Sequence, residues 1–218
     1  MVTNYAYVYG EVATRPVFDH AMDRTDMYSF FIKVMRRSGT CDILPVHISA
    51  RLLRRHKIVQ GDKLGIAGQF HSYSYRKDGS CHLRLYIYAA EVRKEVAEAA
   101  NYIALSGTIC KPPVYRTTLN GYEVTDLMMA INRQNGRSDY IPAIVWNTNA
   151  RFTADLPVGT HVVLIGRMQS RNYNKVLPDG NIQLMVAYEA SAFFVEATLK
   201  RASVTNYIKE APFYGDVT

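Results

Sequence analysis

The sequence feature that most constrains the fold is an internal repeat that covers most of the chain. Gly10 aligns with Gly107, and the same shift aligns Pro16, Arg36, Gly39, Asp42 and Pro45 with Pro113, Arg133, Gly136, Asp139 and Pro142. One further position of shift aligns Gly61, Gly68, Ser72 and Tyr75 with Gly159, Gly166, Ser170 and Tyr173. A duplicated sequence indicates a duplicated structural unit, and 218 residues suit two domains of about 100 residues each. We therefore predict one domain at 1–96, a second at 101–196 and a C-terminal tail at 197–218.

Each copy shows the alternation that is typical of half-buried β-strands. In the first strand Ala6, Val8, Gly10 and Val12 alternate with Tyr5, Tyr7, Tyr9 and Glu11. The inward positions predicted for the next three strands are Phe30, Ile32, Val34, Leu44, Val46, Ile48, Leu64, Ile66 and Phe70 in copy one, and Leu127, Met129, Ile131, Ile141, Ala143, Val145, Val162, Leu164 and Met168 in copy two. A helical crossing precedes the fourth strand, and Asp78-Gly79 and Asp179-Gly180 mark hairpin turns before a fifth. This order predicts an all-β protein of two tandem five-stranded OB-fold barrels.

Composition and motifs narrow the class of function. The formal net charge is +7, which favours a polyanionic partner such as nucleic acid, although a basic balance also serves solubility alone. Cys41, Cys81 and Cys110 are odd in number and widely spaced, so they predict neither a disulfide framework nor a zinc site. We find no signal peptide, membrane span, Walker loop, HExxH or nucleophile elbow. We therefore expect a cytoplasmic, nucleoid-associated protein that is not an enzyme and needs no cofactor or metal.

The nucleic-acid site of an OB-fold lies on the outer face of the second and third strands, between the loops joining strands one to two and four to five. In copy two, Tyr140 and Trp146 occupy outward positions of the third strand, and we interpret them as a platform on which bases stack. The alternative is that Trp146 packs under a loop or in a subunit contact. The cations and aromatics expected beside this platform are Arg133, Arg137, Arg167, Arg171, Tyr173 and Lys175.

Copy one offers a related but different set of outward side chains. The second strand presents Phe31 and Lys33 and ends at Arg36-Arg37, and the fourth strand presents Tyr73, Tyr75, Arg76 and Lys77. Aromatic rings interleaved with cations suit single-strand binding, while a charged strand edge that prevents aggregation is the alternative. The stripe of Tyr5, Tyr7 and Tyr9 shares one face of the first strand. We expect this stripe to be exposed on the chain and covered by a subunit interface.

These motifs together resemble the bacterial single-stranded DNA-binding protein family. Copy two carries LMMAINR at 127–133, DYIPAIVW at 139–146 and GRMQSRNY at 166–173, and copy one carries FFIKVMRRSG, CDILPV, GQFHSYSY and KDG in the same order. The resemblance implies that Tyr140 and Trp146 stack on bases. It also implies that two chains pair as a homodimer to give four OB domains. This chain differs from the family in ending NYIKEAPFYGDVT, without an acidic tail, and in having Ile43 and Ser49 at the platform positions of copy one.

The predicted function is sequence-independent binding and protection of single-stranded DNA in replication, repair and recombination, with replication or repair proteins as further partners. Two alternatives stay open. One is a primosome or plasmid-replication accessory protein that acts mainly by docking other proteins, and the other is an RNA-binding OB module.

Overall fold

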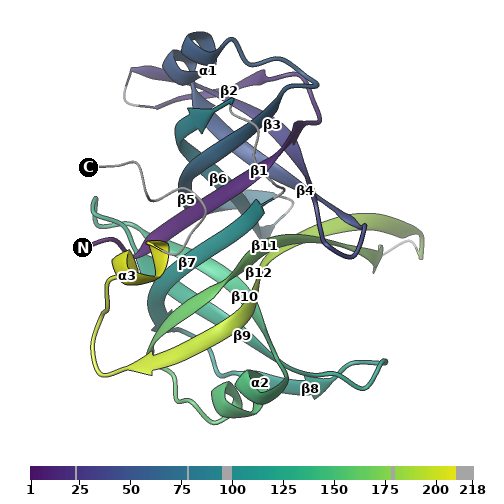
Figure 1. Ribbon diagram of the computed structural model, residues 1–218. Helices are drawn as coiled ribbons and strands as arrows, with labels where there is room; N and C mark the ends of the chain where they lie inside the picture. Colours follow the sequence, from purple (N-terminus) through teal and green to yellow (C-terminus); the bar gives the residue numbers. More distant parts are fainter. Residues whose placement is uncertain (23, 78, 95–99, 178–179, 210–218) are drawn as a thin grey trace.

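The computed structural model describes residues 1–22, 24–77, 79–94, 100–177 and 180–209, and most of them form β-strands (Figure 1). The first half contains β1 (Asn4–Val12), β2 (Val17–Met22), β3 (Thr25–Met35), β4 (Cys41–Ser49), α1 (Ala50–His56), β5 (Lys63–Lys77) and β6 (Ser80–Arg93). The second half contains β7 (Ala100–Ile109), β8 (Val114–Thr117), β9 (Glu123–Asn132), β10 (Ser138–Trp146), α2 (Asn147–Ala154), β11 (His161–Val176) and β12 (Ile182–Thr198), and α3 (Thr205–Ile208) follows.

Each half closes into a barrel with the same strand order. Along the first barrel the order is β2-β3-β4-β6-β5-β1, and pairing of β1 with β3 closes it. Along the second it is β7-β11-β12-β10-β9-β8, and pairing of β7 with β9 closes it. With a helix between β4 and β5, and another between β10 and β11, these are the predicted tandem OB-folds. The short strands β2 and β8, which pair with β3 and β9, were not predicted.

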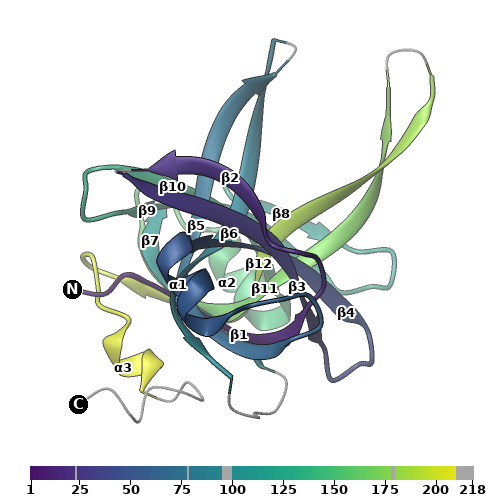
Figure 2. The ribbon, with the colours of Figure 1, turned by 90° about the horizontal axis from the view of Figure 1, so that it is seen from above.

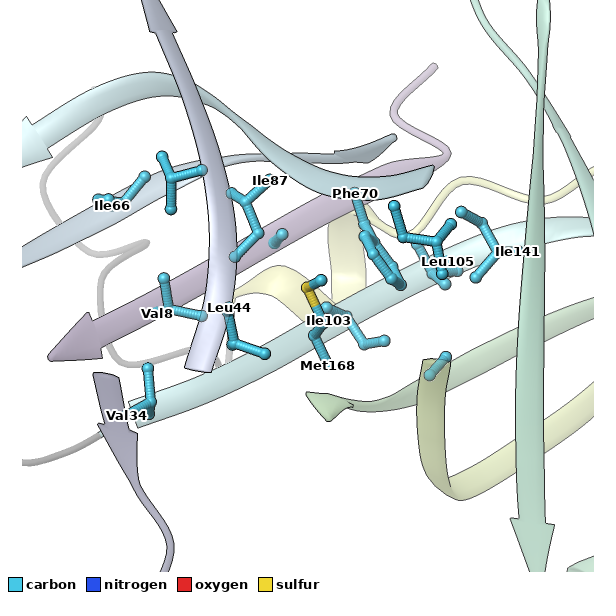
Figure 3. Close-up of a cluster of buried hydrophobic side chains, with 14 of the residues drawn as sticks. Val8, Val34, Leu44, Ile66, Phe70, Ile87, Ile103, Leu105, Ile141 and Met168 are labelled. Atoms are coloured by element: carbon cyan, nitrogen blue, oxygen red, sulfur yellow. The ribbon is translucent and has the colours of Figure 1, made fainter. Parts of the chain in front are cut away.

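The core lies where the alternation places it. Every inward residue predicted for the second, third and fourth strands of both copies is at most 3% exposed. The core is also continuous between the barrels, since Phe70 of the first and Ile103, Leu105, Ile141 and Met168 of the second belong to one buried cluster (Figure 3). Strands β1 and β7 pair antiparallel above it, which joins the two barrels into one sheet.

The tyrosine stripe on β1, formed by Tyr5, Tyr7 and Tyr9, is more buried than the sequence predicted. Tyr7 is 1% exposed and Tyr9 is 7% exposed within the single chain, so the expectation of an exposed stripe is wrong for both. Strand β1 lies between β5 and β7 in the joined sheet, and the Tyr7 ring lies over Gly65, which has no side chain to exclude it. Burial accordingly raises the pKa of the Tyr7 hydroxyl. Only Tyr5 is partly exposed, and its role in a subunit interface stays a prediction.

Two long hairpins, β5–β6 and β11–β12, extend beyond the barrels and project to the same side of the molecule (Figure 2). Each has a bulge where it leaves the barrel, at Gly68 and Gly166, and a bulge bends the strand that carries it. A Cβ at Gly68 would clash with the carbonyl oxygen of Tyr88, and one at Gly166 with that of Ser191. Glycine is therefore required where the hairpins bend.

The first part of the predicted tail is packed on the barrels. Val204 and Ile208 are buried together with Val163 and Ile165 of β11, and the Val204 amide donates to the Val2 carbonyl at 2.8 Å. Strand β12 itself continues to Thr198. Residues 95–99 of the predicted join and 210–218 of the tail lie outside the described residues. In the described part of the chain, none of the helices combines the length and apolar character needed to span a bilayer.

Candidate nucleic-acid interface

A groove of about 780 Å³ lies where the two barrels meet. Its walls include Tyr73 and Arg84 from the first hairpin and Arg137 and Tyr140 from the second barrel. Tyr73 is 46% exposed and Tyr140 is 47% exposed, so both rings are available to a ligand. The sequence predicted Tyr73, Arg137 and Tyr140 in separate repeats, and the structure brings them into one groove. Exposed rings beside cations can stack on bases while the cations neutralise phosphates.

The first hairpin carries a column of stacked rings that continues the groove. Tyr73 and Tyr75 stack with 5.6 Å between ring centroids, and Tyr75 stacks on His82 at 5.3 Å. The guanidinium carbon of Arg84 lies 4.9 Å from the centre of the Tyr75 ring, which is a cation–π contact. Arg76 is exposed on the same strand, and the side chain of Lys77 lies outside the described residues. Preformed stacking of this kind keeps the rings in place before any base arrives.

Trp146 lies at the other end of β10 and lines a second pocket, of about 410 Å³, together with Arg167. Its indole Nε1 donates to the Ser191 hydroxyl at 3.1 Å, and its ring packs edge-on against Tyr122 at 6.4 Å. Trp146 is therefore partly covered, as the packing alternative expected, yet one side of it faces a pocket. Burial lowers the pKa of the Arg167 guanidinium, and the Arg36 charge lowers it further.

Arg133 belongs to a hydrogen-bond network that joins the barrels. It donates to the fully buried carboxylate of Asp139, with 2.9 Å between Nε and Oδ2, and its Nη2 donates across the junction to the Ser72 carbonyl at 2.9 Å. The Ser72 amide donates to Asp139 at 2.6 Å, and the Tyr140 amide donates to the Ser72 hydroxyl at 2.7 Å. This network fixes the base of the first hairpin against β10.

The repeat-related residues form the same network on the other side of the junction. Arg36 pairs with the buried Asp42 at 2.5 Å and donates to the Ser170 carbonyl at 3.3 Å, while the Ser170 amide donates to Asp42 at 2.8 Å. Arg36 and Arg133 were predicted from the sequence to contact nucleic acid. The structure gives their guanidinium groups a structural role at the junction, and contact with nucleic acid stays a prediction for them.

The remaining predicted residues are spread over outer surfaces. Phe31 is 38% exposed on β3, and Lys33 and Arg37 are exposed beside it. On the second hairpin, the Arg171 guanidinium lies 5.9 Å from the centre of the Tyr173 ring, and Lys175 is exposed. The groove does not include these two sets. They lie on separate surfaces, which a strand would reach only by extending beyond the groove.

Residues 100–191 match the model of the Single-strand binding protein family. The second barrel is similar to this family over almost its whole length. It is 36% identical over 80 residues to single-stranded DNA-binding protein 1 of Staphylococcus aureus, and 33% identical over 81 residues to a single-stranded DNA-binding protein of Halalkalibacterium halodurans. Each match covers 34% of this chain and 48% of the relative, so the chain spans about half the length of the curated relatives it matches.

Solved structures extend the likeness to both barrels. The wild-type single-stranded DNA-binding protein of Thermus aquaticus superposes with a TM-score of 0.70 at 18% identity, over 92% of this chain and 95% of that one. A deletion mutant of the same protein superposes with a TM-score of 0.68 at 19% identity, over 90% and 95%. At this identity the likeness establishes the fold alone, so both barrels have the tandem OB arrangement.

Several residues of the groove were not predicted from the sequence, among them His47, Arg84 and Tyr86. The fifth strand of copy one contained the signal, because Arg84 and Tyr86 alternate with the buried Leu85 and Ile87. Tyr86 stacks on His47 with 4.1 Å between ring centroids. Burial lowers the pKa of His47, so its imidazole is neutral at pH 7.

Proposed function

We propose that this chain binds single-stranded DNA without sequence preference, in the groove between the barrels. The observation that carries the proposal is the convergence of Tyr73, Arg84, Arg137 and Tyr140 from two repeats on one cavity. Stacking on an aromatic ring contributes about 1–3 kcal/mol per base and is tolerant of sequence, because every base has a π face. The cations add a phosphate-neutralising term that depends on salt. The match of the second barrel to a single-strand binding family supports this assignment.

A path for the strand follows β10. Tyr140 and Trp146 are six positions apart on this strand, which corresponds to about 20 Å at about 3.3 Å per residue. A strand that reached both rings would pass the outer face of β10 and meet Arg167 beside the indole. In the opposite direction it would meet the stacked rings of the first hairpin. We propose that Arg76, Arg171, Tyr173 and Lys175 guide it beyond the groove.

The wider role we propose is protection of single strands during replication, repair and recombination, in the cytoplasm and on the nucleoid. The chain then acts as a binding protein with two domains at 1–96 and 101–196, and it pairs as a homodimer to present four OB domains. The similarity to the named relatives supports this role, as does the tandem OB-fold.

The test is binding of a labelled oligo-dT strand, measured by fluorescence anisotropy across a salt series, with the matching duplex and RNA as competitors. We expect tight binding of the DNA strand, weak binding of the duplex, and affinity that falls steeply with salt. Tyr140→Ala should weaken binding by about 1–3 kcal/mol. Tyr115→Ala is the matched control, because Tyr115 is similarly exposed, at 43%, but lies on β8 outside the groove. Equal affinities for the two variants would refute the proposed groove.

Protein docking is the second candidate function, and the outer part of the second hairpin favours it. Val176, Ile182 and Leu184 are 66–69% exposed there, which is an apolar surface with no partner among the described residues. Failure of the wild-type chain to bind any single strand at low salt would favour docking over DNA binding. Preference for RNA over DNA of equal sequence would favour the RNA-binding alternative.

A further inference from the structure

Three potential metal ligands meet on the first barrel at one wall of the groove. Asp19 and His20 lie on β2, and His47 lies on β4. The Asp19 Oδ2 atom is 2.5 Å from His20 Nδ1 and 3.6 Å from His47 Nδ1, and one ligand atom from each residue lies within 4.8 Å of the other two. All three residues line the groove, so a ligand bound between them would be reachable from solvent.

A β-bulge allows two neighbouring residues of β2, Asp19 and His20, to approach the same cluster. Successive side chains of a regular strand point to opposite faces, so Asp19 and His20 could not normally both approach His47. The pairing of β2 with β3 shifts register between Phe18 and His20, which leaves Asp19 as the extra residue. Bulges re-aim side chains and are frequent beside functional sites. The bulge therefore brings the Asp19 carboxylate close to both imidazoles.

The third residue is held rigidly with a nitrogen available. The His47 ring stacks on Tyr86 at 4.1 Å, and its side chain is only 16% exposed. Among the described residues, its Nδ1 atom is buried without a hydrogen-bond partner. The 3.6 Å separation from Asp19 is long for a hydrogen bond. It is close to the spacing of about 3.3 Å between two ligands that are each about 2.0–2.1 Å from a tetrahedral ion.

We propose that Asp19, His20 and His47 form a binding site for one divalent transition-metal ion of the Zn²⁺ type. Two imidazoles and one carboxylate are the ligands that Zn²⁺ and its neighbours prefer, and three protein ligands leave a position open for water. Hard cations such as Mg²⁺ and Ca²⁺ need several oxygen ligands, whereas this cluster offers a single carboxylate. The three residues line the groove, where the ion would add positive charge.

The test is a calorimetric titration of the untagged full chain with Zn²⁺ in the absence of nucleic acid. We expect one ion per chain, and roughly tenfold or greater loss of affinity in His20→Ala and in Asp19→Asn. Both residues are exposed, and the asparagine variant preserves side-chain shape, so folding is checked by circular dichroism and at least one variant should be native. His82→Ala is the control, because His82 is on the first hairpin and outside the cluster, and its affinity should be unchanged.

A second measurement identifies the ligands. Co²⁺ bound by the chain should show the absorption of nitrogen and oxygen ligation, without the charge-transfer band of a thiolate. Absence of binding, a thiolate band from the free cysteines, or unchanged affinity in native His20→Ala and Asp19→Asn would each overturn the proposal. Because no nucleic acid is present in these experiments, their failure would leave the proposed DNA binding untouched. Failure of the oligonucleotide test would likewise leave the proposed metal site untouched.

Discussion

Replacing Arg133 with alanine removes one half of an ion pair whose other half cannot reach solvent. The Asp139 side chain is 0% exposed, and after the substitution its carboxylate would keep the Ser72 amide, at 2.6 Å, and a distant His71 imidazole, at 4.0 Å. Removing one partner of a buried pair costs about 3–5 kcal/mol, because the remaining charge stays desolvated. We expect Arg133→Ala to lower the free energy of unfolding by this amount.

The double variant distinguishes this mechanism from simple loss of contacts. Arg133→Ala combined with Asp139→Ala leaves no buried charge, so its cost should be smaller than the sum of the single costs by about 1–3 kcal/mol. Arg137→Ala is the control, because Arg137 is exposed on the same turn, and its effect should stay within about 0.5 kcal/mol.

The assay is urea unfolding at pH 7, followed by circular dichroism for the whole chain and by fluorescence of the single tryptophan for the second barrel. Coincident transitions would justify a two-state treatment. A cost below about 1 kcal/mol for Arg133→Ala, or additive costs in the double variant, would refute the view that Asp139 depends on this arginine.

Two further predictions concern pH and the C-terminal segment. Burial lowers the pKa of His71 from 6.5 to about 4, so the unfolded chain binds its proton first, and stability should fall by up to about 3 kcal/mol as pH drops from 6.5 towards 4. Urea unfolding at several pH values measures this, and a slope equally steep in His71→Gln would contradict it. Ile208→Ala should cost about 2–4 kcal/mol, because Ile208 is 1% exposed, whereas Val59→Ala, at a 58% exposed site, should cost little. Equal costs in unfolding experiments would show that α3 does not pack as described.

Much of the fold could be predicted because period-two burial is a local signal. The inward residues of the predicted strands, such as Ile32 and Met129, follow from alternation alone. Strand β2, by contrast, has six exposed residues, so VFDHAM shows no alternation of burial to detect. Tyr7 and Tyr9 were misjudged because β1 is covered on both faces, and this depends on pairing with β7 far along the chain.

The candidate site was predictable in part. Tyr73 and Tyr140 were recognised from strand parity, but their convergence in one groove depends on how the barrels pack, which no local pattern encodes. Arg36 and Arg133 were predicted to contact nucleic acid. Their structural role could not be seen locally, because the serines that they contact belong to the opposite repeat. The sequence did contain a signal for this role. The arginine and the aspartate that it pairs with are identical in both copies, and they perform the same role on both sides of the junction.

The pairing of β1 with β7 joins two barrels of the same chain, so the barrels associate intramolecularly. Two barrels that met only as separate chains would part on dilution, whereas here the peptide link keeps them at an effective concentration in the millimolar range for a short linker. Their association is therefore independent of how much protein is present. Once both barrels lie in one gene, they are also free to diverge: Tyr140 and Trp146 of the second barrel correspond to Ile43 and Ser49 of the first. Covalent joining thus allows the two barrels to carry different residues at matching positions while they stay together.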